Sequence, residues 1–517
     1  MTVRLPYTTF DIESDIQKVR NQDQRILFIG QKVASGTATP LTIIEDIPND
    51  TSWDTLLGAT SMLAGMIRAA KQENVVSRMD AIAVEDNIGS TASTADITIV
   101  GATSADTELT IDIGSSINYS YTISVENGDN ETAIAAAWET LINADSKRIV
   151  EASAVAGVLT LTAKNSGLEG NSIGLRVTGD LAGLTSITVP HMAGGTVSPV
   201  IDTIPTVIGN RRYQHIVMPQ SYDVSAIATW LDGRFSVDND IRNGTLLISK
   251  TDSVTNLKTL GNGYDNKSLD IHGNITAADY EGSSIFELDT VIASKCAAIW
   301  ALRLTDDANI SRLTLSAYGA RDAFGGMHLA SKPYHNTPFF NLPVADAGDE
   351  ISNTEQKELN TAGVFFLGNN PVRREIISGD VVTTYKTHPV TSQSDISFKY
   401  QNYVDTLSEI REYFVNNVRA RFAQARLTEG DIVDDIDMAN ENSISAYLNE
   451  LYEDLTDEAL TVKGNNALRF FKANKTVSLD VSTGKVVVNM KVPIVTQIRE
   501  IEGVIEVSFT ITLQAAA

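Results

Sequence analysis

Hydrophobic and polar residues alternate strictly near the end of the chain. The apolar positions of this run are Ile505, Val507, Phe509, Ile511 and Leu513, with Glu, Ser or Thr at each position between them. A period of two with β-branched and aromatic residues predicts a half-buried strand, which spans roughly 30 Å at about 3.3 Å per residue. Residues 500–503 before it are expected to act as a hinge. The strand can therefore pair within its own sheet or join the edge of a neighbouring subunit's sheet.

The first hydrophobic pattern begins after a polar arm, residues 1–24. Apolar runs at 25–29 and 79–84 predict buried strands, and an apolar stripe over 51–70 predicts a helix between them. This β–α–β order indicates an α/β core. The core is expected to resume at about residue 200, with strands over 213–218 and 245–249, helices over 226–231 and 284–304, and an irregular surface excursion over 305–358.

The composition changes at about residue 88. From there to about residue 199 the chain is rich in Gly, Ser, Thr and Ala, and its short alternating segments are typical of strands. One helix interrupts them, with Asn130 or Asp129 as its N-cap and apolar residues at helical spacing up to Ile142. We therefore expect an inserted, mostly β domain over 88–199 that loops out of the α/β core.

The C-terminal part has the clearest helical periodicity. Apolar residues recur there at steps of three and four, at Tyr403, Leu407, Ile410, Phe414, Val418 and Phe422. A second amphipathic helix is expected from Ile444 to Leu455, and strands over 381–385 and 485–492. These elements predict an α+β module over 359–503, followed by the arm strand within 504–517. The whole chain is thus predicted to be an α+β multidomain protein, with its α/β core formed by 25–87 and 200–358.

Charge is distributed unevenly along the chain. The formal net charge is -25, which argues against binding to a nucleic-acid backbone or to an anionic membrane surface. Residues 428–460 carry eleven acidic side chains and no Lys or Arg, whereas residues 462–476 carry Lys463, Arg469, Lys472 and Lys475 and no acid. Such runs are either solvated faces or the two halves of a docking surface.

Hydropathy gives no indication of a membrane segment. No apolar run approaches the roughly 18 residues that a transmembrane helix needs. The first residues also lack the apolar segment of a secretory signal. We therefore expect neither a membrane-spanning helix nor a signal peptide.

Residues that could carry catalysis are scattered rather than grouped. The histidines, expected on the surface or in loops, are His191, His215, His272, His328, His335 and His388. The single Cys296 lies in an apolar, helix-like stretch and is expected to be a buried structural thiol. The glycines of 167–174 lack the ending of a phosphate loop and predict a turn, and no Glu closes a calcium loop after Asp238 and Asp240. We expect no enzyme, no cofactor and no metal site.

An ordered set of segments resembles a known family. It comprises Leu27-Phe-Ile-Gly-Gln31, the helix at 56–66, the Gly194-Gly195 exit from the inserted domain, the segments 362–364 and 382–385, and the entry at 395–414 into the long helix. Together these segments resemble the tail sheath protein of contractile-tailed bacteriophages of the Mu-like type. The resemblance covers nearly the whole chain.

The resemblance implies an assembly and a mechanism. Sheath subunits form six-fold rings stacked helically around a tail tube, with the C-terminal module inside and the inserted domain outside. Terminal arms donate strands to the C-terminal sheets of neighbours, and contraction drives the tube through the host envelope. The implied partners are further copies of the chain, the tail tube protein, and the baseplate and tail terminator proteins. The implied location is the virion tail, assembled in the host cytoplasm, with no nucleic-acid partner and no direct membrane insertion.

The resemblance also assigns roles to the charged and alternating segments. Lys463, Arg469, Lys472 and Lys475 are expected to face an acidic tube or a neighbouring subunit, and the strand from Ile505 to Leu513 is expected to pair with the next subunit. Three other interpretations remain open from the sequence. They are the sheath of a headless phage-derived injection particle, a non-contractile surface or capsid-type protein, and a hydrolase that uses some of the many carboxylates.

Overall fold

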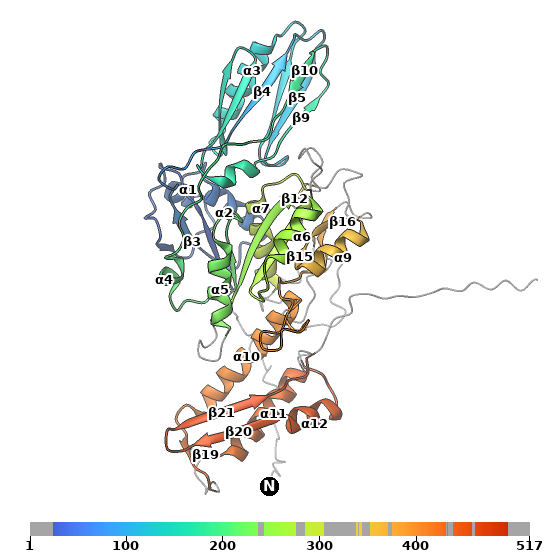
Figure 1. Cartoon of the computed structure of the whole chain (residues 1–517). Helices are drawn as coiled ribbons and strands as arrows, with labels where there is room; N and C mark the ends of the chain where they lie inside the picture. The colour runs from blue at the N-terminus through green and yellow to red at the C-terminus, as the bar shows by residue number, and fades with distance from the viewer. Residues whose placement is uncertain are drawn as a thin grey trace, which may run out of the picture.

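The computed structural model describes residues 24–235, 242–275, 285–303, 338–339, 341–343, 352–370, 375–430, 432, 438–457 and 461–494. Figure 1 shows three parts along one axis, with the inserted domain at the top, the core in the middle and the C-terminal module at the bottom. All but residue 24 of the expected arm over 1–24, most of the excursion over 305–358 and the strand predicted at 505–513 lie outside the described residues.

The core is built on one seven-stranded sheet. Its order is β15-β13-β12-β11-β1-β3-β2, and all neighbours pair in parallel except β2 and β3. The strands are β1 (Arg25–Gln31), β2 (Ile43–Ile44), β3 (Arg78–Val84), β11 (His215–Val217), β12 (Thr245–Asp252), β13 (Leu269–Ile275) and β15 (Val364–Phe365). The strands predicted over 25–29, 79–84, 213–218 and 245–249 are thus confirmed, whereas the pattern analysis missed β13.

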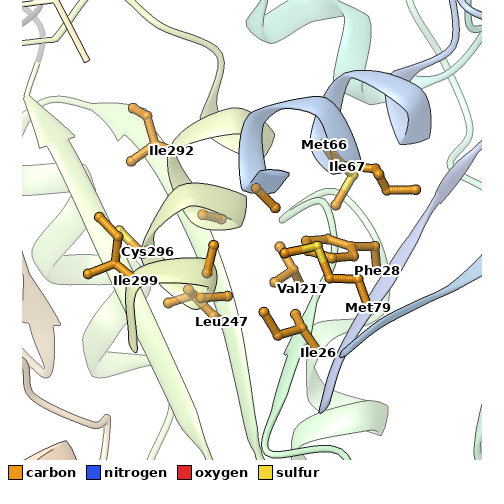
Figure 2. Close-up of a cluster of buried hydrophobic side chains, with 14 of the residues drawn as sticks. Ile26, Phe28, Met66, Ile67, Met79, Val217, Leu247, Ile292, Cys296 and Ile299 are labelled. Carbon is orange, nitrogen blue, oxygen red and sulfur yellow. The ribbon is translucent and has the colours of Figure 1, made fainter. Parts of the chain in front are cut away.

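Helices cover both faces of this sheet because its strands are apolar on both sides. On one face, Ile26 and Phe28 pack with α2 (Met62–Glu73) and α7 (Asp289–Arg303), and Cys296 is buried there as expected (Figure 2). On the other face, Leu27 and Ile29 pack with α4 (Ile204–Ile208), α5 (Val224–Arg234) and α6 (Val254–Asn262). Each such fully buried side chain stabilises the fold by about 1.5–3 kcal/mol.

The helix predicted over 51–70 is in fact two helices. The first, α1 (Trp53–Leu57), ends at Gly58, whose φ of 80° takes the chain out of the helical region. The second, α2, begins after Ser61, whose hydroxyl accepts a hydrogen bond from the Ala64 N–H at 3.1 Å. A continuous apolar stripe did not reveal this break, because side chains of both helices are buried in the same core.

The inserted domain packs two small antiparallel sheets and one helix around a common core. The first sheet has the order β10-β4-β8-β7 and the second β6-β5-β9. The strands are β4 (Thr94–Val100), β5 (Thr107–Ile113), β6 (Ser120–Val125), β7 (Val150–Val155), β8 (Val158–Ala163), β9 (Leu175–Gly179) and β10 (Ser186–Thr188). The helix is α3 (Glu131–Ala144), and Asn130 caps it as predicted, accepting from the Ala133 N–H at 3.0 Å. Its Trp138 is fully buried between the sheets.

The expected start of the C-terminal module at residue 359 does not match the packing. α9 (Asn353–Ala362) lies against α6, and β15 pairs with β13, so this stretch belongs to the core sheet. β16 (Leu367–Asn370) and β17 (Glu375–Ser378) follow β15 and form a small sheet with β14 (Pro338–Phe339), which precedes it in the chain. The hydrophobic cluster of the module itself starts at Ile410.

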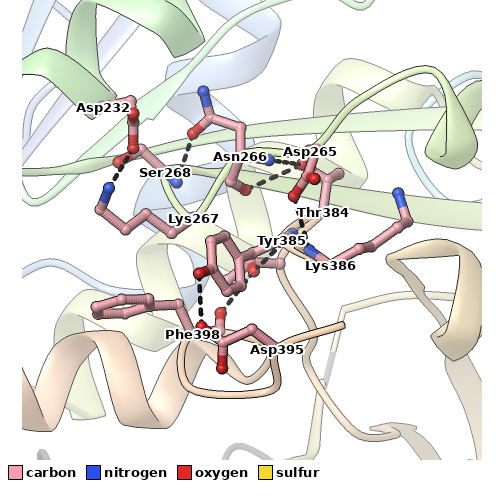
Figure 3. Close-up of polar contacts among 11 residues, drawn as sticks. Asp232, Asp265, Asn266, Lys267, Ser268, Thr384, Tyr385, Lys386, Asp395 and Phe398 are labelled. Carbon is pink, nitrogen blue, oxygen red and sulfur yellow. Dashed lines mark hydrogen bonds and ion pairs between the residues drawn. The ribbon is translucent and has the colours of Figure 1, made fainter. Parts of the chain in front are cut away.

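The segment 381–385, predicted as a strand, forms only isolated bridges to the core. Thr383 bridges to Asp270 of β13, and the Thr384 N–H donates to the Leu269 carbonyl at 2.9 Å. The following loop is bonded to the core and to itself (Figure 3): the Asp265 carboxylate accepts from the Lys386 N–H at 2.7 Å, and the Tyr385 hydroxyl donates to Asp395 at 2.7 Å. Side-chain hydrogen bonds therefore replace a regular strand ladder here.

Candidate assembly site in the C-terminal module

One long helix, α10 (Gln401–Phe422), connects the core to the module. Its first half is held on the core, where the Gln401 amide donates to the Thr245 hydroxyl at 2.9 Å. Near the middle, Arg212 of the core forms an ion pair with Glu412 at 2.6 Å. Its second half contributes Phe414 to the module's own hydrophobic cluster. The predicted periodicity of this helix therefore reflects two different packing partners.

Stacked aromatic rings hold the module together. Tyr452 of α11 (Glu441–Asp457) and Phe471 of α12 (Asn465–Ala473) stack with ring centroids 4.4 Å apart and planes 14° apart. The Tyr452 hydroxyl also donates to the Val462 carbonyl at 3.0 Å, ahead of α12. These contacts fix α12, which the pattern analysis missed, against α11.

A two-stranded antiparallel hairpin covers α11. It pairs β20 (Lys475–Asp480) with β21 (Lys485–Met490). Its inner face, which includes Val477, Leu479 and Val488, packs on the module's hydrophobic cluster. Its outer face is exposed at Thr476, Ser478, Val487 and Asn489. A two-stranded ribbon is marginally stable by itself, so the packing on α11 is what supports it.

Both long edges of this hairpin carry unpaired backbone groups in the described part of the chain, where neither strand has a second neighbour. The Lys491 N–H donates to the Asn474 carbonyl, so the ladder's hydrogen-bonded pairs are Asn474/Lys491, Thr476/Asn489 and Ser478/Val487. In an antiparallel ladder the residues between such pairs point their N–H and C=O groups outward. Those residues are Val477 and Leu479 on β20 and Val486 and Val488 on β21. Such an edge can accept another strand.

The four basic residues of 462–476 do not form one patch. Lys463, Arg469 and Lys472 are exposed on and before α12. Lys475 instead is buried, and its ammonium donates to the Ser445 carbonyl and to Asn449 Oδ1, both at 2.5 Å. Loss of hydration, with a smaller contribution from Lys472, lowers the pKa of Lys475 to about 8. Lys475 thus stabilises the module internally, while the other three cations face outward.

The acidic run is only partly described. Glu441, Glu450, Glu453 and Asp454 lie on the exposed face of α11. The Tyr413 hydroxyl donates to Asp454 at 2.9 Å, which ties α10 to that face. The acids Asp431, Asp434, Asp435, Asp437 and Glu458 of the run fall outside the described residues. The described part of the run therefore corresponds to a solvated helix face.

The crevice where open α/β sheets usually bind ligands is occupied by the inserted domain. That crevice lies at the carboxyl ends of the parallel strands where the strand order reverses, here beyond β1. Gln31 at the end of β1 donates to Asp86 at 2.6 Å and to the Ser166 carbonyl at 2.5 Å. Asn165 of the inserted domain donates to the Lys32 carbonyl at 3.0 Å. These contacts couple the inserted domain to the core at the place where a substrate would otherwise bind.

Buried carboxylates line the rest of this junction. Glu287 of the core accepts from the Ser115 hydroxyl of the inserted domain at 2.8 Å, and burial raises its pKa to about 7. Asp289 accepts from Thr251 at 2.6 Å, and burial raises its pKa too. Asp289 also lines a cavity of about 50 Å³ between the two parts, which is of the size that water fills. The carboxylates thus serve packing between the two parts.

Two histidines correct the expectation of surface or loop positions. His215 on β11 and His272 on β13 are fully buried. Loss of hydration lowers the pKa of His215 to about 4 and that of His272 to about 3, so both are neutral. His272 Nδ1 lies 2.9 Å from the Ser249 hydroxyl, but this pair is covered by Phe365 and α7 rather than open to a substrate.

The segments that the sequence offered as metal-binding or phosphate-binding candidates have structural roles where they are described. The described ranges hold no cluster of three or more His, Cys, Asp or Glu that could bind a metal ion. Asp238 and Asp240 lie outside those ranges, and the Asn243 amide donates to Ser408 of α10 at 2.6 Å. The glycine-rich segment after Gly167 forms a short 3-10 turn, Leu168–Ser172, in the inserted domain, as predicted. No described helix combines the length and hydropathy of a membrane span.

Comparison with known proteins identifies a partial sequence relative. No protein-family model matches the chain. The Mu-like prophage FluMu tail sheath protein of Haemophilus influenzae is 27% identical over 225 residues, which are 42% of this chain and 45% of the relative. The match therefore spans less than half of the relative's length.

Two solved structures overlap with the fold more loosely. A sheath tail protein from Listeria innocua gives a TM-score of 0.47 at 13% identity and covers 92% of both chains. The contracted helical sheath of the anti-feeding prophage gives a TM-score of 0.38 at 12% identity and covers 99% of both chains. Structural overlaps at this level do not support an assignment to a family. The resemblance to a tail sheath protein therefore rests on the sequence match. The similarity over 225 residues confirms the expected resemblance of this chain to a tail sheath protein of the Mu-like type.

Proposed function

We propose that this chain is a structural, non-enzymatic subunit of a contractile tail sheath, which assembles by adding its terminal strand to a neighbour's C-terminal sheet. One observation carries the proposal. The module presents a two-stranded sheet whose edges are unpaired among the described residues, and the same chain contains nine alternating residues at 505–513 whose pattern predicts a strand. The partial similarity to a tail sheath protein supports the same function.

The two partners match in pattern. The inner face of the hairpin is apolar and the outer face is largely polar. A strand added at either edge can place Ile505, Val507 and Phe509 on the inner side, where they would extend the cover over α11. Glu506, Ser508 and Thr510 would then face solvent beside Ser478 or Val487. Since side chains alternate along a strand, a shift by one residue would expose the apolar set, so the pattern also fixes the register.

The energetics make the apolar face decisive. Each added backbone hydrogen bond contributes about 1 kcal/mol net. Ordering each residue of the strand costs about 1–2 kcal/mol. These two terms roughly cancel, so burial of the five apolar side chains, at about 1.5–3 kcal/mol each, makes the link favourable.

The assembly that follows is a stack of six-fold rings around a tail tube. Core and inserted domain would move as one body, since polar contacts couple them at the junction. If residues 500–503 act as the hinge expected from the sequence, the strand links would persist during contraction. Contraction would drive the tube through the host envelope. In this arrangement the chain is a virion tail component, with tube, baseplate and terminator proteins as its partners.

The outward cations of α12 fit a role at an acidic partner. Arg469 and Lys472 are three positions apart on α12, and both are exposed. They can therefore approach either the tube or the acidic face of α11 in a neighbouring subunit. Lys475 is excluded from this role by its burial.

Truncation tests the proposal. We expect the full chain to form hollow, helically striated tubes in negative-stain images, and the chain lacking 504–517 to remain a folded monomer by circular dichroism. Replacing Ile505, Val507 and Phe509 with Ser should have the same effect. Replacing Thr510 and Thr512 with Ser is the matched control and should leave the tubes intact. Normal tubes from the truncated chain would refute the role of the strand.

A further inference from the structure

Two extended segments connect the core to the inserted domain and lie side by side. We call this connection the neck. Residues 87–95 leave the core and residues 192–201 return to it. They run antiparallel, with bridges from Thr91 to Thr196 and from Thr94 to Ala193. The Asn87 amide donates to the Ser198 carbonyl at 3.0 Å, which extends the pairing to the core end of the neck. The neck is therefore a hydrogen-bonded ribbon rather than two loose linkers.

A third segment lies against this ribbon. The Gly167 N–H donates to the Thr91 carbonyl at 2.9 Å, and the Asn171 side chain exchanges hydrogen bonds with the Gly195 backbone at 2.9 and 3.0 Å. A Cβ at Gly195 would lie 2.2 Å from the Gly167 carbonyl oxygen, so only glycine permits this approach. This contact explains Gly195, and a φ of 84° explains Gly194, the other glycine of the pair noted in the sequence.

Large aliphatic side chains on these three segments point into solvent. We call them the neck patch: Ile88, Leu168, Val197 and Val200, which are 99%, 45%, 49% and 63% exposed. Single exposed aliphatic residues are common on protein surfaces and need no explanation. Four of them on three bonded, adjacent segments are the kind of apolar surface that marks an interaction site.

The neck ribbon is also free of charge. Neither 87–95 nor 192–201 contains Asp, Glu, Lys or Arg, although such residues make up 20% of the chain and its net charge is -25. Two copies of so acidic a chain repel each other wherever their acidic surfaces meet. A charge-free ribbon lets copies approach without that repulsion, and depletion of charged residues is typical of the centre of protein interfaces.

We infer that the neck patch is a contact surface for a second copy of this chain. The inference rests on the proposed function, in which copies of the chain assemble with one another, and it adds a contact far from the C-terminal module. The backbone hydrogen bonds hold the ribbon in place before binding, so little ordering entropy is lost on contact. Ile88, the most exposed aliphatic residue of the patch, would be buried most.

Paired substitutions test the inference on the full-length chain. We expect the double variant Ile88→Asp/Val200→Asp to reduce the fraction of protein that sediments as tubes at least tenfold at equal concentration. The double variant Ile88→Ser/Val200→Ser should reduce it less, because it removes apolar area without adding charge. The matched control is Val155→Asp. Val155 is 70% exposed at the turn between β7 and β8, at the far end of β8 from the neck.

The outcomes separate the possible explanations. Normal tubes from both double variants, or an equal loss from Val155→Asp, would overturn the inference while leaving the proposed function intact. Absence of tubes from the unmodified chain would overturn the proposed function itself. If the serine variant melts at a lower temperature as an isolated monomer, the patch is covered by the chain's own residues, and this outcome also overturns the inference.

Discussion

The hydroxyl of Ser115 in the inserted domain lies 2.8 Å from Oε2 of Glu287 in the core, and it donates a buried hydrogen bond across the junction of the two parts. The Asn118 amide donates to the same oxygen at 3.4 Å, and the Leu288 N–H donates to the other carboxylate oxygen at 3.1 Å. The Glu287 carboxylate therefore accepts the hydrogen bonds that Ser115 and Asn118 of the inserted domain donate to the core. Its protonation state should affect how firmly the two parts are joined.

Glu287 should make stability depend on pH. Burial raises its pKa from 4.5 to about 7, against the smaller opposing effect of Lys295. The folded state then holds a proton that the unfolded state loses, so the free energy of unfolding falls as pH rises from about 4.5 to about 7 and levels off above it. The total loss is on the order of 3 kcal/mol.

The neutral variant Glu287→Gln isolates this effect. Its unfolding midpoint, measured by thermal denaturation between about pH 5 and about pH 8, should fall less with pH than that of the unmodified chain. Glu151→Gln, at an exposed ion pair with Lys164, is the control and should leave this pH window unchanged. If the unfolding midpoints of Glu287→Gln and of the unmodified chain change equally with pH, Glu287 is not the group with the raised pKa.

Lys475 and Lys472 should differ sharply in their effect on stability although only two residues separate them. Lys475→Ala leaves the Ser445 carbonyl and Asn449 Oδ1 without the buried ammonium that both contact. Hydrogen bonds to charged groups contribute about 1.5–3 kcal/mol, so the urea midpoint of the module should fall clearly. Lys472→Ala, on the exposed face of α12, should change stability by less than about 0.5 kcal/mol. Equal midpoints would show that Lys475 is not the internal contact described.

Two helical glycines give opposite predictions. A Cβ at Gly261 in α6 would lie 2.5 Å from the Ala362 carbonyl oxygen and 2.6 Å from Val364 Cγ2. Gly261→Ala should therefore destabilise the core by about 1–3 kcal/mol through overpacking. Gly233 in α5 has no atom within 4 Å of the same position, so Gly233→Ala should be neutral or stabilising by up to about 1 kcal/mol. Urea denaturation distinguishes them, and an equal effect would contradict the close packing of α6 against α9 and β15.

Local patterns predicted those elements whose signals lie within a few residues. The buried run of β1, the Asn130 cap of α3 and the period of α10 were all readable from neighbouring side chains. β13 was not predicted because Asp270, Gly273 and Asn274, residue types that are rare in strands, interrupt its apolar positions, although Asp270 and Asn274 are buried. A period of two looks like a half-exposed strand until the partner that buries the polar side is known.

The candidate site divides in the same way. The sequence distinguished the cations of 462–476 from the acids before them, but it could not separate Lys475 from Lys472. Only the fold brings Ser445 and Asn449 of α11 beside the first residue of β20. Similarly, the start of the module was expected at 359, after the irregular excursion over 305–358, whereas the long-range pairing of β15 with β13 assigns β15 to the core.

In the proposed assembly, the strand predicted at 505–513 pairs with the sheet of another subunit rather than with a sheet of its own subunit. Cysteines placed on the solvent side of both strands test it directly, as Ser508→Cys or Thr510→Cys combined with Ser478→Cys or Val487→Cys. Facing Cβ atoms of adjacent strands lie about 4.5–5.5 Å apart, and the closer pairs reach the roughly 4.5 Å that a disulfide spans, while the native Cys296 is buried. Under mild oxidation of assembled tubes, pairing between subunits should give a ladder of covalent multimers on a non-reducing gel. Disulfides that form only within single chains would contradict it.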